Sequence, residues 1–194
     1  MVYKEAITKE ELYELPLKHF EGEIVLVNSE SEVKDAVKYL SQFPFLGFDT
    51  ETRPSFKKGQ IYKVALLQLS TNDKAFIFRL SRFDLTKPLL SLLANPTIVK
   101  AGAAIRDDIK ALQINKNFKA GGFVELQDEA QKLGITNFSL KKMAGIVLGM
   151  KISKAQQLSN WEAPELTEQQ LLYAATDAWI SYKIYEAFIN GNNE

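Results

Sequence analysis

The stretch "FLGFDTETRP", residues 45–54, joins an apolar run to two carboxylates, Asp49 and Glu51. The run from Phe45 to Phe48 predicts a buried strand. Successive side chains of a strand alternate between its two faces, so Asp49 and Glu51 must point the same way at close range. Like charges so placed repel each other. The pair therefore predicts either a positively charged neighbour or, as the simpler alternative, a solvated strand end that caps the next element.

The length and composition predict an ordinary globular protein. The 194 residues suffice for one hydrophobic core, so we expect a single domain over residues 1–194, with residues 1–21 as an N-terminal extension. No stretch approaches the roughly 18 apolar residues of a membrane span. The opening "MVYKEAITKEEL" has no apolar segment typical of a secretory signal. We expect a cytoplasmic protein that does not bind membranes.

Two residue types restrict the chemistry. The absence of cysteine excludes disulfides, thiolate nucleophiles and cysteine-based zinc sites. The single histidine, His19, lies in an expected linker, so a surface or packing role is its simplest reading and a catalytic role its alternative. The net charge of zero predicts no global field that attracts nucleic acid, although it leaves local patches open.

The order of the expected elements predicts the fold class α/β, with a mixed β-sheet flanked by α-helices. Turn residues at 71–73 join two apolar runs and predict an antiparallel pair. Later segments alternate between helical and extended patterns, which favours parallel strands. The expected strands are residues 22–29, 63–70, 74–80, 97–102 and 123–126, with a further strand in the stretch 45–54 that ends near Asp49 and Glu51. The expected helices are 8–14, 29–42, 84–95 and 103–113, with further helices to the end.

A second acidic site lies in "AGAAIRDDIKAL", residues 101–112. At about 100° per residue, the helical phase turns Asp108 toward the apolar face that carries Ile105 and Leu112, and turns Asp107 toward solvent. The alternative is that Asp108 only interacts with the helix dipole in the first turn.

A third acidic site lies in the last expected helix, which opens with a capping box from Thr167 to Gln170. Asp177 stands in an apolar stripe, four residues after Tyr173. Because an unpaired buried charge is costly, Asp177 needs a partner, and a salt bridge to a basic residue of the core is one possibility.

Four carboxylates without histidine or cysteine predict ligation by oxygen alone. Such a ligand set suits Mg²⁺ or Mn²⁺ rather than Zn²⁺. Two such ions can activate a water and stabilise the leaving oxygen of a phosphodiester. A pair of bound cations would be the positive charge that Asp49 and Glu51 require.

The three acidic segments, "FDTET", "AGAAIRDDIKAL" and "YAATDA", resemble in order and spacing the motifs of the DEDD 3′-5′ exonucleases, in the form with a tyrosine in the last motif. The resemblance is greatest to the exonuclease domain of the Werner syndrome protein, and weaker to ribonuclease D and the proofreading domains of family A DNA polymerases. It extends to "KVALLQLS", "FVEL", "SLKKM" and "LSNWEAPELTEQQLLYAATDA", and so covers roughly residues 24–190. The doublet Asp107-Asp108 and the loop "RPSFKKGQIYK" depart from the family pattern.

The resemblance implies a ribonuclease H-like fold and a two-metal-ion 3′-5′ exonuclease. It implies that the metal-binding acids are Asp49, Glu51, Asp108 and Asp177, and that Tyr173 orients the attacking water. With an ordinary pKa near 10, Tyr173 suits that role better than the role of a general base. No helicase or helical appendage fits in the remaining residues, so we expect a stand-alone exonuclease without a partner protein.

Basic and aromatic residues near the motifs are candidate contacts to a single-stranded or frayed 3′ end. Each lysine has the alternative role of a solubilising surface residue. The candidates for substrate binding are Thr50, Thr52, Lys57, Lys58, Tyr62, Lys151 and Lys154. DNA is the favoured substrate. The alternatives are an RNA-processing exonuclease and a non-catalytic nucleic-acid-binding module of the same fold.

Overall fold

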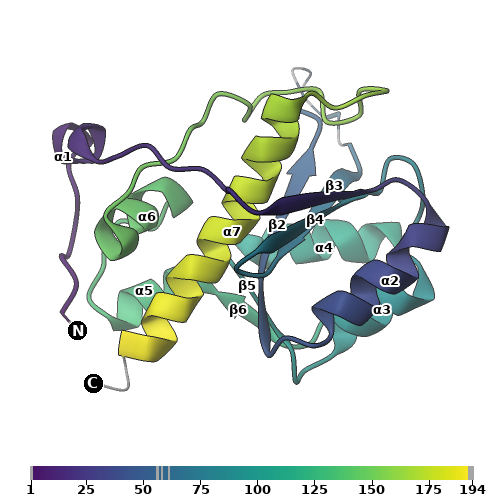
Figure 1. Ribbon diagram of the computed structural model, residues 1–194, viewed down its shortest axis with the longest axis horizontal. Helices are drawn as coiled ribbons and strands as arrows, with labels where there is room; N and C mark the ends of the chain where they lie inside the picture. Colours follow the sequence, from purple (N-terminus) through teal and green to yellow (C-terminus); the bar gives the residue numbers. More distant parts are fainter. Residues whose placement is uncertain (1, 56, 58, 61, 192–194) are drawn as a thin grey trace.

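A six-stranded mixed sheet forms the centre of the structure (Figure 1). The structure is a computed structural model, and it describes residues 2–55, 57, 59–60 and 62–191. The strand order is β1-β4-β3-β2-β5-β6. The strands are β1 (Glu23–Val27), β2 (Phe45–Thr52), β3 (Val64–Ser70), β4 (Lys74–Arg79), β5 (Val99–Gly102) and β6 (Phe123–Glu125). β3 is antiparallel to β2 and β4, and the other neighbouring strands are parallel. The predicted α/β class is confirmed.

Helices cover both faces of this sheet (Figure 1). Residues of α2, α3 and α4 share one apolar cluster with the sheet, and residues of α5, α6 and α7 share clusters with its other face. The helices are α1 (Lys9–Glu14), α2 (Glu30–Leu40), α3 (Lys87–Ala94), α4 (Ile105–Asn115), α5 (Leu126–Lys132), α6 (Leu140–Leu148) and α7 (Glu168–Gly191). Within the described part of the chain, no helix has the length and apolar character that a membrane crossing requires.

The last helix, α7, lies close against β2. It opens with the predicted capping box, in which the Thr167 hydroxyl accepts the Gln170 N–H at 3.2 Å and the Gln170 side chain accepts the Thr167 N–H at 3.0 Å. A Cβ added at Gly47 of β2 would lie 1.9 Å from the carbonyl oxygen of Ala178, so only glycine permits this approach. The close contact brings Asp177 of α7 next to the acids of β2.

The N-terminal segment packs against the rest of the fold rather than extending from it. The Lys18 N–H donates to the carbonyl of Lys151 at 2.9 Å. The Phe20 N–H donates to the Thr176 hydroxyl at 3.1 Å, and the Phe20 ring is 2% exposed. Residues 16–20 are therefore held at both ends, against α7 and against the segment before it.

The predicted helix over residues 103–113 begins two residues too early. α4 begins at Ile105, because Ala104 has a φ of 61°, in the left-handed region. The Glu125 carboxylate accepts the N–H groups of Ala104 at 2.8 Å and Ile105 at 2.9 Å. The carboxylate of Glu125, at the end of β6, thus caps the N-terminus of α4.

Candidate active site

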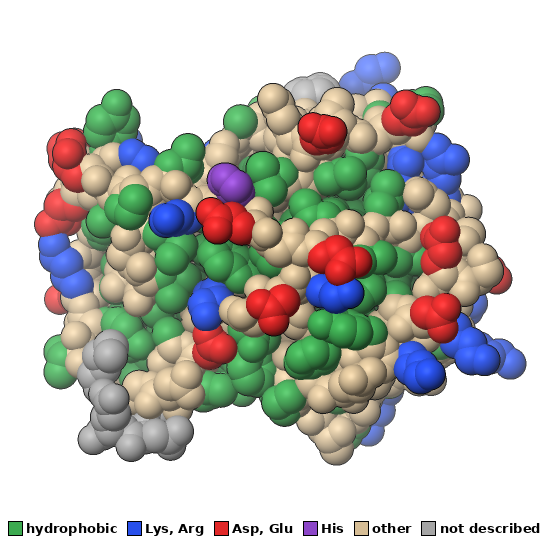
Figure 2. Space-filling model, in the orientation of Figure 1, with side chains coloured by type: hydrophobic (Ala, Val, Ile, Leu, Met, Phe, Trp, Pro, Cys, Tyr) green, Lys and Arg blue, Asp and Glu red, His purple; other side chains and the backbone are tan. Residues whose placement is uncertain are grey.

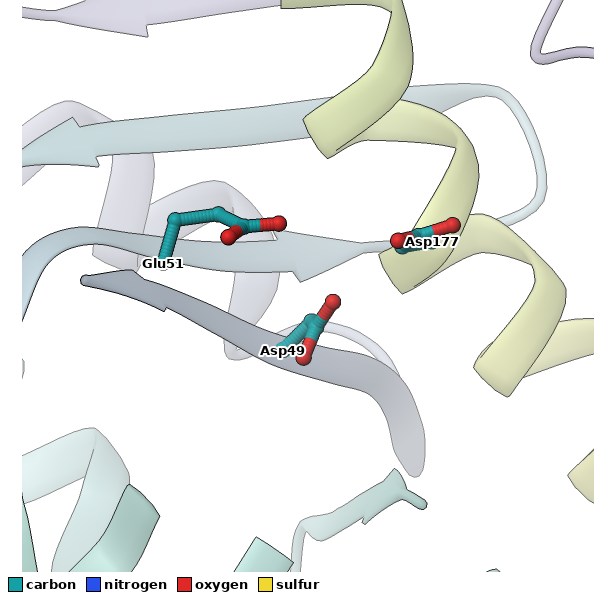
Figure 3. Close-up of side chains that lie close together, drawn as sticks. All are labelled: Asp49, Glu51 and Asp177. Carbon is teal, nitrogen blue, oxygen red and sulfur yellow. The ribbon is translucent and has the colours of Figure 1, made fainter. Parts of the chain in front are cut away.

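Three carboxylates converge where α7 crosses β2 (Figure 3). Asp49, Glu51 and Asp177 each offer one oxygen, and these oxygens all lie within 4.8 Å of one another. Asp49 and Glu51 come from the same face of β2, as the alternation of a strand predicts. Asp177 faces them from α7, so residues far apart in the sequence form one acidic cluster.

Burial and mutual repulsion hold protons on this cluster. Burial raises the pKa of Glu51 to about 10, with the charge of Asp49 adding to the effect. Burial also raises the pKa of Asp49 well above its usual range, and the charge of Asp177 raises it further. Burial raises the pKa of Asp177 to about 7, against a hydrogen bond from Tyr173 and the charge of Lys154. Such a cluster ionises readily only when a cation neutralises it.

Asp177 has a tyrosine rather than a basic residue as its partner. The Tyr173 hydroxyl lies close enough to the Asp177 carboxylate to lower the pKa of Asp177, and both side chains line the same cavity. None of the ion pairs formed by the described residues includes Asp177. A buried salt bridge therefore does not explain this acid. Burial and the charge of Asp177 raise the pKa of Tyr173 above its usual range, so the hydroxyl keeps its proton at neutral pH.

The two aspartates of the doublet face different environments, as the helical phase predicts. The Asp107 side chain is 92% exposed and pairs with Lys110 at 2.9 Å. Asp108 accepts a hydrogen bond from the Thr50 hydroxyl. Asp108 stands outside the group of three oxygens, yet its charge raises the pKa of both Asp49 and Glu51. Asp108 therefore lies beside the cluster, and Asp107 does not.

The donor set fits a hard divalent cation. It consists of carboxylate oxygens, which Mg²⁺ and Mn²⁺ prefer. Asp49, Glu51 and Asp177 are close enough to share one ion, and Asp108 approaches from the α4 side. The buried carboxylates have no neutralising arginine or lysine ion pair among the described residues. Among the described residues, the charge of Lys154 acts on Asp177, and no cation lowers the pKa of Asp49 or Glu51, so the cluster favours a bound cation.

A cavity of about 270 Å³ opens over the acids. Asp49, Glu51, Tyr173 and Asp177 line it together with Lys154, a predicted substrate contact. Of the two predicted threonines, Thr50 also lines this cavity, and Thr52 is exposed at the end of β2.

The remaining candidates for substrate binding that the structure describes do not line this cavity. The Lys151 ammonium donates to the carbonyl of Tyr13 and lies 4.5 Å from the centre of the Tyr13 ring, so it holds α1 in place. Tyr62 lines a different cavity, on β3 and β4. Lys57 is exposed, and Lys58 lies outside the described residues.

Two residues near the acids were not predicted. His19 lines a cavity of about 320 Å³, and Tyr173 and Asp177 line both this cavity and the acidic site. Figure 2 shows the histidine in purple at the surface, beside acidic side chains. Gln68 is fully buried and lies opposite Asp49 in the β2-β3 ladder, with both atoms of its amide unpaired. A single polar residue in the apolar run "VALLQLS" could have marked Gln68 as unusual. The position of His19 near the acids follows only from the packing of residues 16–20.

The sequence matches known exonucleases over most of its length. The model of a 3′-5′ exonuclease family matches residues 24–191. The bifunctional 3′-5′ exonuclease/ATP-dependent helicase WRN of Mus musculus is 36% identical, over 91% of this chain and 13% of its own length. A 3′-5′ exonuclease of Arabidopsis thaliana is 30% identical, over 88% of this chain and 65% of its own. The chain thus spans about an eighth of the length of the first relative and about two thirds of the length of the second.

Solved structures share the fold. The Nibbler EXO domain of Aedes aegypti superposes with a TM-score of 0.80 at 22% identity, over 91% of this chain and 93% of its own. Escherichia coli RNase D superposes with a TM-score of 0.74 at 20% identity, over 86% of this chain and 45% of its own. The family match, the shared fold and the order of the acidic motifs agree, and the chain belongs to the 3′-5′ exonuclease family of the DEDD type.

Proposed function

We propose that this chain removes nucleoside 5′-monophosphates one at a time from the 3′ end of nucleic acid, with DNA favoured, by a two-metal-ion mechanism. The observation that carries the proposal is the convergence of oxygens of Asp49, Glu51 and Asp177 within 4.8 Å of one another, with Tyr173 lining the same cavity. Cytoplasmic location and action without a partner protein belong to the same proposal.

The acids hold the ions, and Tyr173 orients the nucleophile. Asp49, Glu51, Asp108 and Asp177 would bind two Mg²⁺ or Mn²⁺ ions, which would activate a water and stabilise the leaving oxygen. The Tyr173 hydroxyl faces the same cavity and stays protonated, so it donates a hydrogen bond rather than accepting a proton. The partial burial of Asp49 and Glu51 and the full burial of Asp177 limit contact with bulk water, which strengthens each of these interactions.

The substrate contacts are assigned to Lys154 and Thr50, which line the cavity, and to further residues of the first motif and the loop that follows it. Lys154 lines the cavity beside Asp177 and offers a positive charge to a phosphate. Thr50, Thr52, Lys57 and Lys58 follow or interrupt the first motif. An RNA-processing enzyme and a binding module without activity are the alternatives to a DNA exonuclease. The complete set of acids with Tyr173 supports an enzyme, because mere binding does not require repelling carboxylates.

Matched 5′-labelled DNA and RNA oligonucleotides, incubated with Mg²⁺ or Mn²⁺, test the proposal. We expect a ladder of products that shortens by single nucleotides from a free 3′ hydroxyl, with DNA degraded faster than RNA. Rapid cleavage of a circular single strand would contradict an exonuclease. Faster degradation of RNA would assign the chain to RNA processing, and binding without products would favour the non-catalytic module.

Substitution of Tyr173 separates water orientation from metal binding. Tyr173→Phe removes the hydroxyl and leaves the acids, so it should slow hydrolysis by less than Asp177→Asn does. The apparent metal affinity of Tyr173→Phe, from the dependence of rate on Mn²⁺ concentration, should match that of the wild type. A large loss of metal affinity would show that Tyr173 supports the ligands instead.

A further inference from the structure

A second cavity, of about 730 Å³, lies between the ends of β3 and β4 and the segment before α7. Its charged lining consists of Lys63, Arg79, Arg82 and Glu162. Glu162 is already paired with Arg53 at 3.3 Å. Three cationic groups therefore face this cavity, and its one carboxylate is shared with a further cation. In a chain of zero net charge, such a concentration of positive charge is a local feature of this surface.

Arg79 is the most unusual member of this cavity. It is 3% exposed, and among the ion pairs of the described residues none includes Arg79 or Arg82. Its guanidinium donates to the carbonyls of Ala163 and Pro164, and its Nε is buried without an acceptor. Burial, with the charge of Arg82 adding, lowers the pKa of Arg79. A buried guanidinium without a carboxylate leaves positive charge that an anion would neutralise.

The sheet register places this cavity near the acids. Glu51 is paired with Leu66 in β3, and Leu66 is paired with Arg79 in β4, so the three side chains leave the same face of the sheet. With about 4.8 Å between neighbouring strands, the backbones of Glu51 and Arg79 are about 10 Å apart. That distance corresponds to about three nucleotides of a stacked strand at a rise of about 3.4 Å each, and to fewer nucleotides of an extended strand.

Aromatic and basic groups continue from the acids to the cavity. Arg53 follows β2 directly and lies 5.1 Å from the centre of the Tyr62 ring. Tyr62 in turn lines the cavity beside Lys63. The loop after β4 and the segment before α7 meet at the same end of the sheet (Figure 1), where the Arg82 guanidinium donates to the carbonyl of Pro164. A nucleic acid strand whose 3′ end lies at the acids would meet these groups upstream.

We propose that this cavity binds backbone phosphates of the nucleic acid a few nucleotides upstream of the 3′ end, through Arg82 and Lys63 in front of the buried Arg79. The inference rests on the proposed function, because it assumes a nucleic acid strand at the acids. Tyr62 offers a ring on which an upstream base stacks. The site holds the substrate in register and takes no part in the bond cleavage.

The double variant Lys63→Gln/Arg82→Gln tests this site, with Lys34→Gln/Lys38→Gln on the exposed surface of α2 as a control of equal charge. In the hydrolysis-deficient Asp177→Asn background, fluorescence anisotropy with a 12-nucleotide single strand should show about tenfold weaker binding at low salt for the test pair. The slope of log affinity against log salt should fall by about 1.4 in magnitude, at about 0.7 for each of the two phosphate contacts on a single strand. The control pair should change neither quantity appreciably.

Two further variants separate charge from structure. Lys63→Gln alone removes no hydrogen bond to the segment before α7, whereas Arg82→Gln does. The Lys63→Gln variant should therefore reduce the salt slope without lowering the melting temperature. Arg82→Lys keeps the positive charge and should retain the wild-type slope. If the test pair remains folded and its salt slope and affinity equal those of the control pair, the proposal is overturned.

Hydrolysis of a dinucleotide distinguishes this failure from failure of the proposed function. A dinucleotide is too short to reach the cavity, so Lys63→Gln/Arg82→Gln, with Asp177 intact, should cleave it as fast as the wild type while kcat/KM for the 12-nucleotide strand falls. Equal loss on both substrates would overturn an upstream phosphate site. Absence of hydrolysis and binding by the wild-type chain on every strand would overturn the exonuclease proposal, and this site with it.

Discussion

The Thr50 hydroxyl donates a hydrogen bond to the Asp108 carboxylate, and this contact joins β2 to the first turn of α4. Thr50 lies between Asp49 and Glu51, so its side chain leaves the opposite face of β2. Asp108 therefore reaches the acidic site from the α4 side of the sheet, whereas Asp177 reaches it from the α7 side. One strand carries two of the acids and orients a third.

Removal of this hydrogen bond should weaken metal binding. Thr50→Val keeps the shape of the side chain but leaves Asp108 without its donor, so the pKa of Asp108 should rise and its carboxylate should move more freely. We expect about tenfold lower activity at limiting Mn²⁺, recovered in part at high Mn²⁺. Thr50→Ser, which retains the hydroxyl, should behave like the wild type. Identical metal dependence in Thr50→Val would show that the contact is incidental.

The aspartate doublet should divide sharply in function. Asp108→Asn should lose most metal-dependent activity, because Asp108 lies beside the acids. Asp107→Asn should keep activity within a few-fold and change the free energy of unfolding by at most about 0.5 kcal/mol, as expected of an exposed side chain. Rates and urea denaturation of both variants decide the matter. An inactive Asp107→Asn would contradict the helical phase and the exposure of its side chain alike.

Metal ions should stabilise the protein, and Asp177→Asn should remove that effect. Mg²⁺ or Mn²⁺ relieves repulsion among the buried acids and binds only the folded state, so it should raise the melting temperature. Without metal, Asp177→Asn should unfold less readily than the wild type, by about 1 kcal/mol, since it removes a carboxylate whose charge raises the pKa of both Asp49 and Glu51. Calorimetry with EDTA and with millimolar Mn²⁺ measures both effects. A fully active, folded Asp177→Asn protein would refute the four-acid site.

Glu125 should act through the position of α4. Glu125→Gln weakens the charge-assisted hydrogen bonds to the N–H groups of Ala104 and Ile105, so it should destabilise the fold by about 1 to 2 kcal/mol. It should also shift the metal dependence of activity, because α4 carries Asp108. Glu30→Gln, an exposed side chain in the first turn of α2, is the control. Loss of stability with unchanged metal dependence would limit Glu125 to a structural cap.

The buried Lys100 should make stability depend on alkaline pH. Its ammonium donates to the carbonyls of Leu92, Asn95 and Ile98, and burial lowers its pKa to about 8. Between pH 8 and about 10.4, the ordinary pKa of lysine, the unfolded chain holds this proton more often than the folded chain does. The free energy of unfolding should therefore rise with pH in that window, by at most about 1.4 kcal/mol per pH unit.

Comparison with Lys100→Met isolates this effect, because the other titrating groups are common to both proteins. The variant leaves carbonyls unpaired and should be less stable than the wild type by about 3 kcal/mol near pH 9. The difference in unfolding free energy between the two proteins should widen as the pH rises from 8 to 10. A constant difference would show that Lys100 keeps an ordinary pKa.

The periodicity of the sequence was enough to predict most of the elements and the orientation of the acids. Alternation along β2 placed Asp49 and Glu51 on one face, and the phase of α4 separated Asp107 from Asp108. Both predictions depend only on local geometry, which repeats every 2 residues in a strand and every 3.6 in a helix. Turn residues and capping boxes likewise act over three or four residues, so they too are legible in the sequence.

Only the tertiary structure decided which distant groups meet. The start of α4 depends on Glu125, twenty residues further along, and the cationic cavity depends on the segment at 162–164 lying over Arg79 of β4. The place of His19 beside Tyr173 depends on how residues 16–20 are held. These contacts depend on the strand register, the closure of the loops and the packing of α7. Many weak interactions across the whole core together determine those features. No local pattern encodes their sum, whereas the periodicity of an apolar face is visible in any short window of residues.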